Sequence, residues 1–131
     1  MIYVDSSALV KLVHEEPESS ALERWLSTRD TGLVVTSELS LVEVVRACRR
    51  IDATALQRTR AFMAELNLIP LTRSVLNDAA EVGAANLRSL DAIHLASAMT
   101  IRDRLSAFVA YDYRLTAAAN AAGLMTVQPG V

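Results

Sequence analysis

Short runs of apolar, often β-branched residues alternate along the chain with longer segments whose apolar residues recur at helical spacing. The short runs predict five strands, at residues 2–4, 33–36, 68–71 (interrupted by Pro70), 107–110 and 125–127. The longer segments predict helices near residues 6–14, 18–29, 38–51, 53–66, 73–87, 90–104 and 113–122. Because strands and helices alternate, we expect a three-layer α/β/α fold around a central, mostly parallel sheet of four to five strands.

Composition narrows the class of protein. The chain has 131 residues without an internal repeat or linker, which predicts one domain over residues 1–131. Apolar residues make up 52% of it, a surplus that permits a homodimer or another buried partner surface. The net charge of −2 argues against a dedicated basic nucleic-acid binder, but not against an enzyme that contacts a few phosphates.

The N-terminal residues and the single cysteine indicate where the protein is located and which metal sites it can form. No signal peptide and no membrane-spanning run is present, so we expect a cytoplasmic protein without membrane attachment. Cys48 is the single cysteine, which excludes an intramolecular disulfide and argues against a thiolate zinc site.

Acidic residues stand where predicted strands end and helices begin. Asp5 follows the first apolar run and Asp112 follows the fourth, each directly before a helix. The carboxyl ends of parallel strands meet along one edge of a sheet, where ligands bind. Glu43, in the helix after the second run, and Asp91, in the helix that leads into the fourth run, can reach the same edge. We therefore expect these four carboxylates to converge.

Each acid also has a purely structural interpretation. Asp5 and Asp112 suit the N-cap position, and Asp91 is a first-turn acid that the helix dipole favours. Glu43 shares a helix face with Arg46, and such a pair would stabilise the helix by about 0.3 kcal/mol. Four acids at one sheet edge are harder to explain by capping alone, but at the level of sequence both interpretations stay open.

Convergent carboxylates need a positive partner because they repel one another. Two unit charges about 4 Å apart repel by about 4 kcal/mol near a protein surface. Carboxylate oxygens without cysteine or clustered histidine favour Mg²⁺ or Mn²⁺ over zinc. Such a site suits hydrolysis of a phosphodiester by water that the metal activates.

Four sequence blocks carry a resemblance to a known family: MIYVDSSALVKL, LVEVVRA around Glu43, LRSLDAIHLASA around Asp91 and VAYDYRLTAAANAAGL around Asp112. In this order and spacing they resemble the PIN-domain ribonucleases, and within them the VapC-type toxins of bacterial toxin–antitoxin pairs. The resemblance covers nearly the whole chain and implies a single PIN-like nuclease domain.

The resemblance also implies which residues form the site. The acidic metal-binding and catalytic set would be Asp5, Glu43, Asp91 and Asp112, with the last completing the set or acting through water. Ser6 or Ser7 matches the small hydroxyl residue that supports the first acid. Where family members often carry Thr or Ser, two residues before the last acid, this chain has Ala110, which can loosen the hydrogen bonding around Asp112.

Basic residues near the acids have candidate supporting roles. His94 follows Asp91 by three residues, where it can shuttle protons or serve only as a structural histidine. Arginines near the acids can hold an RNA backbone, and the candidates for phosphate contact are Arg46, Arg88 and Arg114. The alternative is that these arginines form solvated helix faces.

Aromatic residues make up only 5% of the chain, so few side chains can stack on bases, and we expect RNA to be chosen mainly by shape and backbone. Trp25 lies on an apolar helix stripe that predicts either core packing or a groove for a partner helix. The resemblance implies a cognate VapB-type antitoxin as partner, with its C-terminal segment over the early helices, where it blocks the acidic pocket. It also implies a homodimer.

The sequence therefore predicts the endoribonuclease toxin of a toxin–antitoxin pair, which cleaves RNA phosphodiester bonds with Mg²⁺ or Mn²⁺ as cofactor. One alternative is a PIN-like protein that has lost activity and only binds a partner. Another is a signalling receiver module, which needs an acceptor Asp after its third strand and a Lys after its fifth. The third run here ends in Leu71-Thr72-Arg73, and the only lysine is Lys11.

Overall fold

Five short parallel strands form the centre of the computed structural model, which describes residues 1–29 and 33–131. The strands are β1 (Ile2–Val4), β2 (Val34–Ser37), β3 (Asn67–Ile69), β4 (Ala107–Val109) and β5 (Thr126–Val127). Their spatial order is β3-β2-β1-β4-β5, and all four neighbouring pairs are parallel. The expected parallel sheet is confirmed. The third strand ends before Pro70 because proline has no N–H for the ladder.

In residues 1–29 and 33–131, seven α-helices connect and cover the strands, mostly in the positions that the hydrophobic pattern predicts. They are α1 (Ser6–Val13), α2 (Ser19–Ser27), α3 (Leu39–Ile51), α4 (Leu56–Ala64), α5 (Arg73–Ala79), α6 (Ser89–Met99) and α7 (Tyr113–Ala121), with short 3₁₀ turns at Ala53–Ala55 and Arg102–Arg104. In the described part of the chain, none of these helices is long and apolar enough to cross a membrane.

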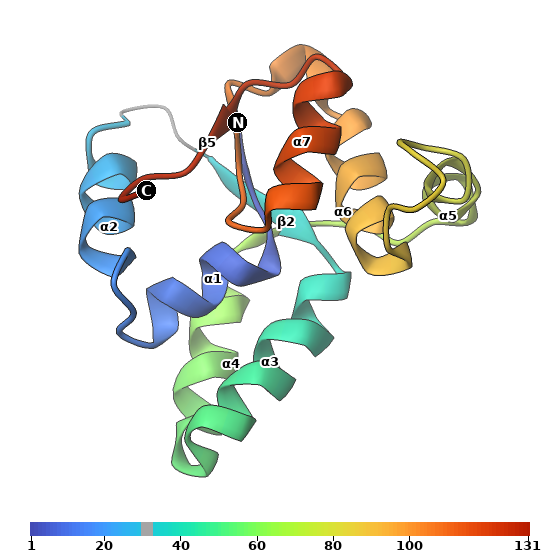
Figure 1. Ribbon diagram of the computed structural model, residues 1–131. Helices are drawn as coiled ribbons and strands as arrows, with labels where there is room; N and C mark the ends of the chain where they lie inside the picture. The colour runs from blue at the N-terminus through green and yellow to red at the C-terminus, as the bar shows by residue number, and fades with distance from the viewer. Residues whose placement is uncertain (30–32) are drawn as a thin grey trace.

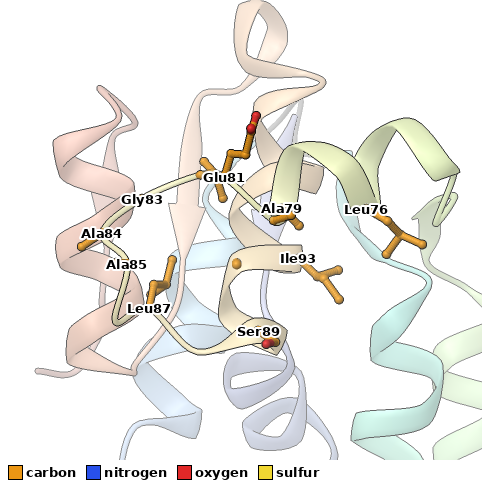
Figure 2. A pocket seen from close by; sticks show the side chains of 12 residues that line it. Leu76, Ala79, Glu81, Gly83, Ala84, Ala85, Leu87, Ser89 and Ile93 are labelled. Carbon is orange, nitrogen blue, oxygen red and sulfur yellow. The ribbon is translucent and has the colours of Figure 1, made fainter.

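The main departure from the predicted elements lies after α5. A helix was expected over residues 73–87, but it ends at Ala79, and residues 80–88 form a loop that leads to α6. Gly83 in this loop has a φ of +73°, in the left-handed region that a helix does not use. The loop stands between two hollows, one toward α5 and α6 (Figure 2) and one toward α7, and Gly83, Ala84 and Leu87 line both.

The helices form layers on both faces of the sheet (Figure 1). Helices α1 to α4 cover one face, where Val4 of β1 and Val109 of β4 pack with Leu9 in one buried cluster. Helices α6 and α7 cover the other face, where Tyr3 and Phe108 belong to a second buried cluster, and α5 packs against α6. Successive side chains of a strand point to opposite faces, so β1 and β4 contribute alternately to both clusters.

The chain order places a switch point between β1 and β4. From β1 the sheet grows outward through β2 to β3, and from β4 it grows in the opposite direction to β5. Ligands of open α/β sheets bind at the carboxyl ends of the strands at such a point. Asp5 directly follows β1, and Asp112 follows β4 by three residues, so the predicted shared edge is confirmed for these two acids.

Candidate active site

Asp5 is a buried carboxylate that is held at the end of β1. Only 4% of the residue is exposed, and its Oδ1 accepts hydrogen bonds from Ser7 Oγ at 2.7 Å and from the Ala8 N–H at 3.0 Å. The second bond caps α1, so the structural interpretation of Asp5 is correct as far as Oδ1 is concerned. Among the described residues, Oδ2 accepts no hydrogen bond. Burial, with a smaller contribution from the charge of Glu43, raises the pKa of the Asp5 carboxyl.

Ser7 ties this carboxylate to the neighbouring strand. Its Oγ donates to Asp5 and accepts a hydrogen bond from the Tyr111 N–H at 3.2 Å. Since Tyr111 lies just beyond β4, the serine joins the two strand ends on either side of the switch point. The resemblance implies that Ser6 or Ser7 supports Asp5, and in the structure Ser7 makes this contact.

Glu43 is held by Ser6 and His94 and makes no ion pair with Arg46. Its Oε1 accepts hydrogen bonds from Ser6 Oγ at 2.5 Å and from His94 Nε2 at 2.7 Å. Partial burial would raise the pKa of this carboxyl, but the hydrogen bonds from His94 and Ser6 outweigh it and hold the pKa below its ordinary value. The helix-pair interpretation of Glu43 is therefore wrong.

His94 is a buried residue of α6 that contacts both Glu43 of α3 and Tyr3 of β1. It contacts Glu43 rather than Asp91, and its Nδ1 lies 2.7 Å from the hydroxyl of Tyr3, which is fully buried. When the neutral ring donates from Nε2 to the carboxylate, Nδ1 is the acceptor and Tyr3 donates to it. The nearby hydroxyls continue the network, because Ser40 Oγ lies 3.2 Å from Ser6 Oγ and 2.7 Å from Thr36 Oγ1.

The roles of Tyr3 and Ser40 could not be read from the sequence. Tyr3 lies within an apolar strand run and is 91 residues from His94, so no local spacing relates the two side chains. Ser40 precedes Glu43 by three residues and thus shares its helix face. That spacing was the one available signal.

Asp91 and Asp112 are joined by a single arginine. Arg88 Nε donates to Asp91 Oδ2 at 3.2 Å, and a terminal nitrogen of its guanidinium donates to Asp112 Oδ2 at 3.1 Å. Asp112 Oδ1 accepts from the Leu115 N–H at 3.0 Å and caps α7. The Arg88 side chain is 61% exposed, so water screens these ion pairs and their contribution to stability is small.

Ala110 leaves Asp112 without a hydroxyl from that position, since its side chain is buried in the second core cluster. The contacts with Leu115 and Arg88 orient Asp112 instead. Of the other two predicted phosphate contacts, Arg46 is exposed and lines a groove beside Glu43, and Arg114 is exposed at the first turn of α7.

The structure thus groups the acids in two pairs: the charge of Glu43 acts on Asp5, and Arg88 joins Asp91 to Asp112. Across residues 1–29 and 33–131, no three side chains of Asp, Glu, His or Cys lie close enough together to form a preassembled metal cage. The donor set nevertheless fits Mg²⁺ or Mn²⁺, because all four groups are carboxylates and the Oδ2 oxygen of Asp5 accepts no hydrogen bond from the described residues. Mg²⁺ usually takes only one or two protein carboxylates, together with water and substrate phosphate.

Comparison with known proteins matches the chain over nearly its whole length. The family model of the PIN domain matches residues 2–121. Ribonuclease VapC47 of Mycobacterium tuberculosis (strain CDC 1551 / Oshkosh) is 43% identical over 134 residues, which cover 99% of this chain and 98% of that protein.

Two solved structures share the fold. The sarcin-ricin loop cleaving toxin VapC20 of Mycobacterium tuberculosis superposes with a TM-score of 0.77 at 20% identity, and the match covers 98% of this chain and 100% of that one. VapBC2 from Rickettsia felis, bound to a DNA fragment from its promoter, superposes with a TM-score of 0.70 at 13% identity, covering 98% and 99%.

The buried contact between Tyr3 and His94 gives a test of the site's framework. Tyr3→Phe removes the hydroxyl and leaves His94 Nδ1 buried without its partner, which should lower the free energy of unfolding by about 1–3 kcal/mol. Urea denaturation measures this change. Tyr113→Phe is the matched control, because Tyr113 is 82% exposed and its hydroxyl has no partner among the described residues. Equal stability of the two variants would contradict the assigned hydrogen bond.

Proposed function

The chain belongs to the PIN domain family, and we propose that it is a toxin of a toxin–antitoxin pair that hydrolyses RNA phosphodiester bonds with the help of Mg²⁺ or Mn²⁺. The observation that carries this proposal is the set of carboxylates at the switch point of the sheet, with Asp5 buried among them. The name of the relative at 43% identity, Ribonuclease VapC47, supports an RNA substrate.

The proposed mechanism assigns separate tasks to the two sets of acids. Asp5 and Glu43 are held rigidly by Ser7, Ser6 and His94, so their remaining oxygens are already oriented for a divalent cation. When bound, such a cation activates water and stabilises the negative charge that develops on the phosphate. Asp91 and Asp112 complete the negative pocket, and Arg88 neutralises them while the pocket is free of substrate.

The structure and the family argue against both alternatives to an active nuclease, a receiver module and an inactive binding protein. A receiver module does not fit a chain of the PIN domain family, and β3 is followed by Pro70, Leu71 and Thr72 rather than by an acceptor aspartate. A PIN-like protein that only binds a partner is disfavoured because all four acids are retained and their supporting hydrogen bonds are in place. The next experiment separates an active nuclease from such a binding protein.

Replacement of one buried acid should abolish cleavage and keep the fold. In Asp5→Asn the side-chain oxygen can still accept from Ser7 and Ala8, but its negative charge is lost, and we expect cleavage of total cellular RNA to fall by at least about 100-fold. Asp91→Asn should behave alike. Excess chelator should also stop the wild-type protein, and added Mn²⁺ or Mg²⁺ should restore it.

The matched control for these variants is Asp52→Asn. Asp52 also caps a short helical turn through the Thr54 N–H, at 2.9 Å, but it lies away from the sheet edge. This variant should cleave RNA at the wild-type rate. Full activity of Asp5→Asn, or of the wild-type protein in chelator, would rule out the proposed nuclease site.

Arginines on either side of the acids are proposed to hold the RNA backbone. Arg46 follows Glu43 by one helical turn and is exposed at the groove that both residues line. In an Asp5→Asn background that cannot cleave, Arg46→Ala should weaken binding of every RNA sequence alike. It should also reduce the slope of log affinity against log salt by about 0.7 for a single strand. Arg60→Ala, on exposed α4 surface, should leave the slope unchanged; a similar loss there would argue against a specific role for Arg46.

A VapB-type antitoxin is proposed to occupy the groove between α1, α3 and the start of α6. This groove has a volume of about 510 Å³ and is lined by apolar side chains beside Glu43, among them Val10, Leu39, Val42 and Leu90. Val42 is 58% exposed and Leu90 49% exposed, which suits the apolar face of a partner helix. A segment bound here would cover Ser6 and Glu43. Trp25, the earlier candidate for a partner groove, instead packs against the first core cluster.

A change at the centre of this groove tests the partner. Val42→Glu should prevent a co-expressed VapB-type protein from co-purifying and from inhibiting cleavage, because it buries an unpaired charge. Met125→Glu, at a residue that is 68% exposed outside the groove, is the control. Light scattering gives the mass of each complex and of the free chain, and so also decides the proposed homodimer. Full inhibition of Val42→Glu would place the antitoxin elsewhere.

A further inference from the structure

A second groove adjoins the acidic site on the side of α7. It lies between α7 and the loop of residues 80–88 and has a volume of about 470 Å³. Its helix side consists largely of alanines, Ala117, Ala118, Ala121 and Ala122, which occupy two adjacent rows at a spacing of four residues. Since an alanine side chain ends at Cβ, this wall is shallow and apolar, and a flat ring can lie against it.

The loop that forms the opposite wall requires glycine at position 83. A Cβ at this position would approach Leu87 Cδ2 to 2.9 Å and Ala118 Cβ to 3.9 Å, and the φ of +73° disfavours any larger residue. Figure 2 shows the loop leaving the end of α5 near Glu81, passing Gly83 and Ala84, and returning through Leu87 to Ser89. The close approach of the Gly83 backbone to Leu87 and Ala118, which shapes the groove, therefore depends on this glycine.

Tyr113 stands at the end of this groove nearest the acids. It directly follows Asp112 in the chain and is 82% exposed. The other aromatic side chains are engaged: Tyr3 and Phe108 are buried and stacked on each other, Phe62 packs against the first core cluster, Trp25 lies under Arg29, and Tyr111 lies under Lys11. Among the described residues, the Tyr113 ring is therefore the aromatic surface beside the acids on which a base can stack.

Polar groups around the groove suit a nucleotide. Arg114 lies on its lining, is exposed, and forms no ion pair with the described residues. Asn86 offers an amide donor and acceptor to the edge of a base, and its side chain makes no hydrogen bond to the part of the chain that the structure describes.

We propose that this groove binds one unpaired RNA base next to the scissile phosphate, with Tyr113 as the ring on which the base stacks. The proposal rests on the proposed nuclease function and adds a specificity-determining residue to it. The face of the base packs on the apolar wall, and the Arg114 guanidinium donates hydrogen bonds to the adjoining phosphate. A fully paired A-form helix cannot enter, because its bases stay stacked within the duplex.

Binding to short oligonucleotides tests the groove. In the Asp5→Asn background, fluorescence anisotropy is measured with single-stranded oligouridine and oligoadenosine, with an abasic strand of equal length, and with a duplex. Tyr113→Ala should weaken binding of the base-bearing single strands by about 5- to 150-fold. It should leave the abasic strand and the duplex unchanged, and Tyr113→Phe, which keeps the ring, should bind like the parent.

A second variant that blocks the groove and a control outside it show whether a loss of binding is specific to the groove. Ala121→Trp fills the groove without touching Tyr113 and should weaken the same single strands, whereas Met125→Ala, at an exposed residue outside the groove, should have no effect. Unchanged binding by Tyr113→Ala, or an equal loss for the abasic strand, would overturn the proposal. A loss of self-association or of antitoxin binding with oligonucleotide affinity unchanged would overturn it too, because another protein would then be the occupant.

Cleavage with Asp5 intact separates this proposal from the nuclease function. If Tyr113→Ala cuts total RNA at the same sites and rate as the wild type while Asp5→Asn is inactive, the base site is refuted and the nuclease stands. If the wild type does not cut RNA in Mn²⁺ but oligonucleotide affinity depends on Tyr113, the base site stands and the nuclease is refuted.

Discussion

Mutual repulsion among carboxylates is the constraint on which this structure depends. Two strands with opposite onward connections end side by side, and Asp5 and Asp112 are carried to the same edge. Hydrogen-bond donors and one arginine cation make this arrangement tolerable. Ser7 holds Asp5, His94 holds Glu43 across 51 residues of sequence, and Arg88 joins Asp112 to Asp91. Each donor is fixed in turn by the packed scaffold.

Helix capping and site chemistry share the same aspartates. Asp5 and Asp112 each use Oδ1 to accept the N–H three residues later, which starts α1 and α7 at the required points. Their second oxygens face the site, where Oδ2 of Asp112 accepts from Arg88. A carboxylate has two oxygens with separate directions, so the structural and the functional interpretation of these residues are both correct. The cap also fixes the side-chain rotamer, which orients the free oxygen.

The surroundings of the acids divide the surface into two grooves with different chemistry. The groove along α1 and α3 combines Val42 and Leu90 with Arg46 and suits an amphipathic helix that covers Glu43. The groove along α7 combines an alanine wall with Tyr113 and suits a flat ring. An inhibitor and a substrate base can therefore approach the same acids from separate sides. Competition between them would arise at the carboxylates and at the arginines that serve the RNA backbone.

Local pattern was enough to predict the alternation of strands and helices, the parallel sheet and the placement of the acids, because periodicity and strand ends are properties of neighbouring residues. It failed for residues 80–88, where it predicts a helix and the structure has a loop with a positive φ at Gly83. For Glu43 it left two interpretations open, and the hydrogen bond from His94 decides against a pair with Arg46. The contacts that define the site join residues up to 104 positions apart, as between Ser7 and Tyr111, and 91 positions apart, as between Tyr3 and His94. Such pairs form only when the folded sheet places distant strands and helices next to each other, so tertiary packing alone decided which donor serves which acid.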